Sequence, residues 1–150
     1  LLKGVIDVND EQFDRVADKI RVAAGGDLTG RTVAVWGLTF KARTDDLRDS
    51  PSVSIIGRLI TAGATVRAFD PTVAGPKPGV PAGVEVCTDP YSATAGADVL
   101  AVLTEWDDFR WLEPDKVAEV MSGREIIDGR NLLDRKDWER AGFRHQGIGR

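Results

Sequence analysis

The sequence predicts an α/β fold, a three-layer sandwich in which helices cover both faces of a mostly parallel sheet, preceded by an N-terminal helix. Three observations lead to it. Short apolar runs alternate with helical stretches after residue 26, and an amphipathic helical pattern stands before them. The 150 residues, 42% hydrophobic and 29% charged, have the size and balance of one globular domain.

The first expected element is a helix from Val8 to Ala24, where apolar residues recur at helical spacing. Asn9 or Asp10 is a plausible cap, and the pair Gly25 and Gly26 ends the helix. A solitary helix ahead of a domain either docks on that domain or belongs to a neighbouring one. The sequence leaves both possibilities open.

The alternating pattern then predicts a parallel sheet, whose ligands bind in the crevice beyond the carboxyl ends of the strands. The proline-rich segment 71–83 is expected to be an irregular surface loop. Strands are expected at 32–35, 64–69, 84–87, 98–103, 125–127 and 143–146, and helices at 52–61, 89–95, 113–122 and 134–141.

A long charged segment follows the first strand, where a dinucleotide fold normally carries its GxGxxG turn. Its cations could meet phosphate oxygens, or they could pair with the aspartates of a solvated loop. We expect Ser50 to cap the next helix and Pro51 to be its first residue. The cations of the segment are Lys41, Arg43 and Arg48.

Two further strand ends carry candidate binding residues. Asp70 occupies the position that binds a ribose hydroxyl in dinucleotide folds, although without the glycine fingerprint a turn residue before proline is the favoured interpretation. Aromatic residues interleaved with carboxylates at 104–111 could wall a base-binding slot, but packing onto the sheet is favoured.

The fifth strand ends in a third candidate, Arg130, which follows a glycine that permits a tight turn. Arg130 is expected to project over the same sheet edge as Lys41. Two cations that converge from different strand ends would form a better anion site than either alone.

Composition excludes several other functions. A net charge of −4 argues against a nucleic-acid partner, and no apolar stretch reaches the ~20 residues of a membrane span. One cysteine and one histidine form neither an internal disulfide nor a zinc cluster, so no metal is expected. Cys87 and His145 are interpreted as structural. Without a signal peptide pattern, a cytoplasmic location is expected, and the start at Leu1 suggests a piece of a longer chain.

Four motifs then resemble a known family. The runs GLTFKARTDDLRDSP, GATVRAFDP, ADVLAVLTEWDDF and IIDGRNLLD, in this order over about 31–134, resemble the C-terminal UDP-binding domain of the UDP-glucose/GDP-mannose dehydrogenase family. The TDD and TEW variants look nearest to UDP-glucose 6-dehydrogenases. The resemblance implies a Rossmann-like domain at 27–150, and a helix at 1–26 from the end of the central dimerisation region.

The resemblance also implies roles for individual residues. Phe40 and Lys41 would contact a UDP-sugar, Arg130 would bind it from the fifth strand, and Arg48 would reach toward NAD. Family members oxidise the sugar alcohol to a carboxylate with two NAD, through a cysteine in a GGxCxPKD-type motif. That motif and the glycine fingerprint are absent from these 150 residues. We therefore expect no catalytic residue in this chain, and NAD bound mainly by a separate N-terminal domain.

The resemblance further implies a homo-oligomer, a dimer in the whole enzyme. Two alternatives remain open from the sequence. One is a free-standing nucleotide-binding or regulatory module without catalysis. The other is a structural role, in which the leading helix mediates dimerisation and the loop cations pair internally.

Overall fold

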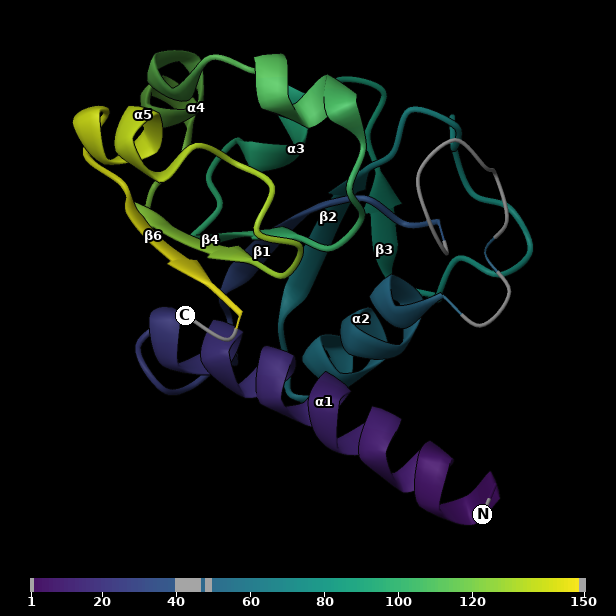
Figure 1. Cartoon of the computed structure of the whole chain (residues 1–150). Coiled ribbons are helices and arrows are strands. Elements are labelled where there is room, and N and C mark those ends of the chain that lie inside the picture. The colour runs from purple at the N-terminus through teal and green to yellow at the C-terminus, as the bar shows by residue number, and fades with distance from the viewer. Residues whose placement is uncertain (1, 40–46, 48–49, 149–150) are drawn as a thin grey trace.

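A computed structural model describes residues 2–39, 47 and 50–148 of the chain (Figure 1). Its sheet has six strands in the order β3-β2-β1-β4-β5-β6, and every neighbouring pair is parallel. The direction of winding reverses between β1 and β4, where ligands bind in open α/β sheets. The strands are β1 (Thr32–Trp36), β2 (Thr65–Phe69), β3 (Val84–Val86), β4 (Val99–Val102), β5 (Glu125–Asp128) and β6 (Arg144–Gly147).

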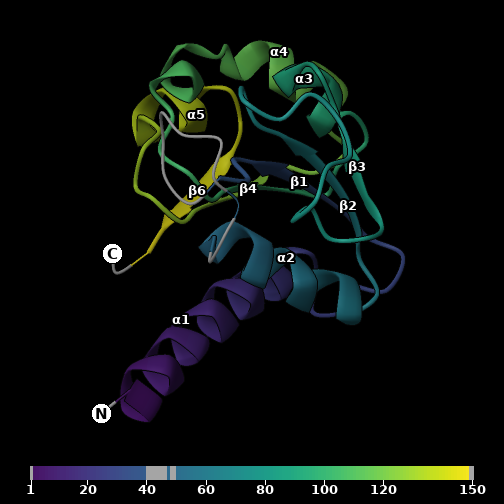
Figure 2. The same ribbon diagram turned by 90° about the vertical axis from the view of Figure 1, so that its right-hand side faces the viewer.

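Helices cover both faces of this sheet, so the predicted Rossmann-like three-layer fold is confirmed. The helices lie in two layers, one under the sheet and one over it (Figures 1 and 2). The lower layer holds α1 (Leu2–Ala23) and α2 (Pro51–Thr61). The upper layer holds α3 (Pro90–Thr94), α4 (Pro114–Val120) and α5 (Arg135–Arg140), with the 3₁₀ helix η1 (Asp107–Trp111) ahead of α4.

Prolines set where several helices begin. Pro51, Pro90 and Pro114 each stand in the first turn of α2, α3 and α4, where the missing N–H costs nothing and the fixed φ suits the helix. These three helices therefore begin within one residue of their predicted starts. The segment 71–83 forms no regular element beyond an isolated bridge between Asp70 and Val73, as its prolines indicate.

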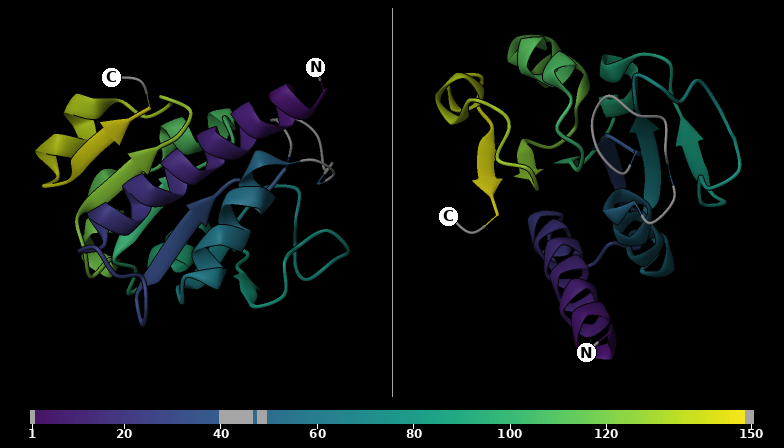
Figure 3. Two further views of the ribbon diagram at one scale, coloured as in Figure 1. Left: turned by 90° about the horizontal axis from the view of Figure 1, so that it is seen from below. Right: turned by 45° about the vertical axis from the view of Figure 1, so that its right-hand side comes forward.

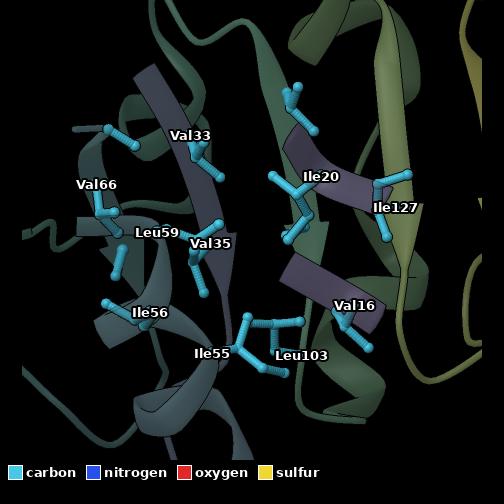
Figure 4. Packing of buried hydrophobic residues seen from close by; sticks show 14 of the residues in the cluster. Val16, Ile20, Val33, Val35, Ile55, Ile56, Leu59, Val66, Leu103 and Ile127 are labelled. Atoms are coloured by element: carbon cyan, nitrogen blue, oxygen red, sulfur yellow. The ribbon is translucent and has the colours of Figure 1, made fainter. Parts of the chain in front are cut away.

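The leading helix α1 docks on the domain. Seen from below, it crosses the strands beside α2 (Figure 3). Ile20 is fully buried and Val16 is 5% exposed, and both lie in one apolar cluster with Leu103 and Ile127 (Figure 4). Because no other helix among the described residues covers this part of the lower face, α1 completes the lower layer. None of the described helices is apolar over a length that would span a bilayer.

Candidate functional site

The ends of β1 and β4 approach closely because residue 37 is a glycine. Gly37 has φ +104°, and a Cβ built there would overlap the side chain and backbone of Thr104. Thr104 in turn donates its hydroxyl to the carbonyl of Thr39 at 3.0 Å. The glycine therefore serves close packing of two strand ends, where a dinucleotide fold would use glycines to approach a ligand.

A buried carboxylate holds the next strand end together. Oδ2 of Asp70 accepts hydrogen bonds from the amides of Leu38 and Thr39, at 2.8 and 3.1 Å, and from Nε1 of Trp106 at 3.3 Å. Oδ1 accepts from the amide of Thr72 at 2.9 Å. Because the protein's own donors occupy Asp70, the favoured interpretation as a turn residue is supported over that of a ribose ligand.

The aromatic residues after β4 divide into two groups. Trp106 and Phe109 are buried, and Phe109 stacks on Trp36 with ring centroids 5.4 Å apart. Trp111 is 79% exposed and takes no part in this packing. The packing interpretation therefore holds for the first two aromatics and not for the third.

Asp128, at the end of β5, is a second buried carboxylate. Its Oδ2 accepts from the amides of Leu132 and Leu133, at 2.8 and 2.7 Å, and from Nε2 of His145 at 3.0 Å, while Oδ1 accepts from the amide of Arg130 at 3.1 Å. Burial alone would raise the pKa of Asp128, but the hydrogen bonds from His145 and the three amides outweigh it and lower the pKa.

Neither the role of Asp128 nor its link to His145 is foreseen from the sequence. The available signal is an acid that ends an apolar strand just before a glycine, a position from which a carboxylate can accept amides of the following turn. Asp128 matters for the site because its hydrogen bond with the amide of Arg130 fixes the backbone from which Arg130 projects.

Arg130 stands at the rim of a small pocket at the carboxyl end of the sheet. Its Nη2 donates to Oε1 of Glu105 at 2.5 Å, and its side chain is 40% exposed. The pocket encloses about 160 Å³ between α1, the first turn of α2 and the segments after β4 and β5. The residues that line it are Gln12, Phe13, Val16, Pro51, Ile55, Leu103, Gly129 and Arg130.

The start of α2 also faces this pocket through Pro51. Ser50 occupies the predicted cap position, but its hydroxyl makes no cap hydrogen bond and donates instead to the carbonyl of Leu38 at 2.7 Å. The prediction is therefore right about the position and wrong about the hydroxyl. The partial positive charge of the helix N-terminus adds to that of Arg130 and favours an anion here.

The other predicted binding residues cannot be placed beside Arg130. Phe40, Lys41, Arg43 and Arg48 lie outside the described residues. Their neighbour Leu47 is described and is buried against Gly79. The convergence of Lys41 and Arg130 on one anion stays a prediction.

Cys87 has the surroundings of a structural residue. It is 8% exposed, and its Sγ lies 3.6 Å from a carboxylate oxygen of Glu85, which pairs with Arg67 at 2.7 Å. Burial raises the pKa of the Cys87 thiol, and the attraction of Arg67 does not offset it. A thiol that stays protonated is a poor nucleophile. Within the described part of the chain, no three potential ligands cluster as a metal site would require.

Comparison with known families gives a match over most of the chain. Residues 34–135 match the UDP-binding domain of the UDP-glucose/GDP-mannose dehydrogenase family. The whole chain is 39% identical to a UDP-glucose 6-dehydrogenase of Rhizobium meliloti and aligns in full, with 38% identity, to UDP-glucose 6-dehydrogenase TuaD of Bacillus subtilis. The chain spans 34% and 32% of these two relatives, about a third of their length.

Solved structures give the same result for the fold. A UDP-glucose dehydrogenase from Pyrobaculum islandicum superimposes with a TM-score of 0.74 and 27% identity, over 97% of this chain and 31% of its own. An NDP-N-acetyl-D-galactosaminuronic acid dehydrogenase from Methanosarcina mazei gives a TM-score of 0.78 and 28% identity, over 94% of this chain and 29% of its own.

Proposed function

The chain belongs to the UDP-glucose/GDP-mannose dehydrogenase family, and from this premise we propose that it binds the UDP part of a nucleotide sugar beside Arg130. The observation that carries the proposal is the position of the guanidinium. It lines a pocket beyond the carboxyl ends of β4 and β5, next to the reversal of winding between β1 and β4, and open α/β sheets bind ligands beyond the carboxyl ends of their strands.

The energetics of Arg130 favour a phosphate ligand. Its present partner, Glu105, is 50% exposed, and an exposed ion pair contributes about 0–1 kcal/mol. A charge-assisted hydrogen bond to a bound diphosphate contributes roughly 1.5–3 kcal/mol. Because the hydrogen bond to a diphosphate contributes more than the ion pair with Glu105, a ligand-binding role for Arg130 is favoured over a purely structural one.

Three further residues enter the proposal through the family resemblance. Phe40 and Lys41 contact the sugar nucleotide from the segment after β1, and Arg48 reaches toward NAD. Lys41 supplies a second cation to the diphosphate. Replacing Lys41 by alanine should therefore weaken UDP-glucose binding far more than Cys87→Ala, because Cys87 is buried and its charged neighbours among the described residues are Arg67 and Glu85.

In the whole protein, the proposed reaction is the oxidation of UDP-glucose to UDP-glucuronate by two NAD. The chain contributes the nucleotide-sugar half of the site, and NAD binds mainly to a separate domain. The helix α1 belongs to the end of a central region through which the whole enzyme forms a homodimer. Because the GGxCxPKD motif is missing from these residues, the chain alone has no dehydrogenase activity.

Calorimetric titration of the 150-residue chain with UDP-glucose, and separately with NAD, tests this proposal. We expect heat of binding with UDP-glucose and little or none with NAD, because the NAD fingerprint is absent. Measurable affinity for NAD without affinity for UDP-glucose would contradict the proposal.

A further inference from the structure

A carboxylate stands beside the cation that is proposed to meet the diphosphate. Oε1 of Glu105 lies 2.5 Å from Nη2 of Arg130, and the two side chains are 50% and 40% exposed. Arg130 makes no other side-chain hydrogen bond among the described residues. An anion that reaches Arg130 therefore also comes close to the negative charge of Glu105.

Both partners project from fixed backbone. Thr104 and Trp106, which flank Glu105, are buried and hydrogen-bonded to the ends of β1 and β2 through Thr39 and Asp70. These contacts fix the backbone from which the Glu105 side chain projects.

Arg130 is held in a similar way. The amide of Gly129 donates to the carbonyl of Val102 at 2.8 Å, and the amide of Arg130 donates to Asp128 at 3.1 Å. The backbone positions of Glu105 and Arg130 are therefore both fixed at the carboxyl ends of β4 and β5.

We propose that Glu105 is a specificity-determining residue, which selects a diphosphate diester against ligands that end in a free phosphate. The inference rests on the proposed function, in which Arg130 meets the diphosphate. A diester phosphate carries one negative charge, whereas a terminal phosphate carries about −1.5 to −2 at neutral pH. Repulsion from the carboxylate of Glu105 grows with the ligand's charge, so UDP and inorganic pyrophosphate are disfavoured relative to UDP-glucose.

The carboxylate of Glu105 can lie beside Arg130 without preventing Arg130 from binding a ligand. The guanidinium has five N–H donors, and one carboxylate oxygen occupies only one of them. Within the described ranges no other group accepts from the remaining donors, so Glu105 reduces the attraction of Arg130 for highly charged anions and leaves donors for a phosphate.

Glu105→Gln tests the proposal, because it removes the charge and keeps a side-chain oxygen as acceptor. UDP-glucose, UDP and inorganic pyrophosphate are titrated into the 150-residue chain, and amide chemical shifts of Gly129 and Arg130 report binding. We expect the affinity for UDP and for pyrophosphate to rise about two- to fivefold relative to that for UDP-glucose. Glu105→Asp, which keeps the charge, should stay near the wild type.

Glu113→Gln is the matched control. Glu113 is 61% exposed, pairs with Lys116 at 2.7 Å and precedes α4 in the upper layer without a side-chain cap hydrogen bond, away from the pocket. The Glu113→Gln substitution removes the same charge and should leave the affinities for UDP and pyrophosphate, relative to that for UDP-glucose, unchanged. Equal changes in Glu105→Gln and Glu113→Gln would overturn the inference, as would a uniform change for all three ligands in Glu105→Gln.

The outcomes also separate this inference from the proposed function. A wild-type chain that binds pyrophosphate but no UDP-glucose contradicts the proposed function, and the pyrophosphate affinities of Glu105→Gln and Glu113→Gln still decide the role of Glu105. Failure of every variant to bind any of the three ligands would contradict both. If the wild type binds UDP-glucose and Glu105→Gln leaves the relative affinities for the three ligands unchanged, the inference alone would be contradicted.

Discussion

Nε2 of His145 lies 3.0 Å from Oδ2 of Asp128, and both side chains are completely buried. Because a carboxylate only accepts hydrogen bonds, Nε2 donates, and Nδ1 is left without a partner among the described residues. The pair joins β6 to the turn that carries Arg130. The histidine that the sequence marks as structural is therefore part of the support of the proposed site.

Asp128→Asn should destabilise the fold by about 1–3 kcal/mol at neutral pH, because it replaces one of the two acceptor oxygens by an NH₂ group that faces buried N–H donors. The pKa of Asp128 is lowered on folding, so its contribution is complete above the ordinary value of 3.8 and is lost as pH falls through the folded value. The difference in unfolding free energy between wild type and Asp128→Asn should therefore shrink below about pH 3.8. Urea unfolding from pH 7 downward measures it, and a difference that grows toward acid would contradict this account.

Gly37→Ala should destabilise the fold on the order of 3 kcal/mol, because φ is +104° and the new Cβ would overlap Thr104. Gly57, within α2, is the control. A Cβ there would have no neighbour within 4 Å, so Gly57→Ala should stabilise by about 0.5–1 kcal/mol. Thermal and urea unfolding compare the two variants, and similar changes in both would refute the packing role of Gly37.

The docking of α1 predicts that Ile20→Ala destabilises the chain by about 2–5 kcal/mol, since Ile20 is fully buried against the sheet. Val22 lies on the same helix and is 60% exposed, so Val22→Ala should change stability by less than about 0.5 kcal/mol. A single unfolding transition is expected in both cases. If Ile20→Ala were as mild as Val22→Ala, α1 would not be part of the domain's core.

The fold could be predicted from the sequence because its signals are local. Runs such as Val33 to Trp36 and Val99–Val102 are apolar throughout, as strands buried on both faces are, and Pro51 and Pro114 mark helix starts. The docking of α1 could not be decided in this way. The amphipathic pattern defines an apolar face but does not say which surface covers it.

The site was harder to predict because its geometry depends on contacts between distant residues. Arg130 could be proposed from its place after β5, but Glu105 lies 25 residues away in sequence and the link between Asp128 and His145 spans 17. Ser50 shows the same limit, since its hydroxyl bonds to Leu38, a partner that only the folded chain supplies. Residue type and position fixed the candidates, and tertiary contacts determined their roles.

The most direct test of the central claim is the affinity of the chain for UDP-glucose before and after Arg130→Ala, measured by calorimetry. Arg140→Ala is the control, because Arg140 is 75% exposed on α5 and pairs with Asp137, away from the pocket. Loss of charge-assisted hydrogen bonds predicts at least about a tenfold weaker affinity in Arg130→Ala and no change in Arg140→Ala. Unchanged binding of UDP-glucose in Arg130→Ala would contradict the account.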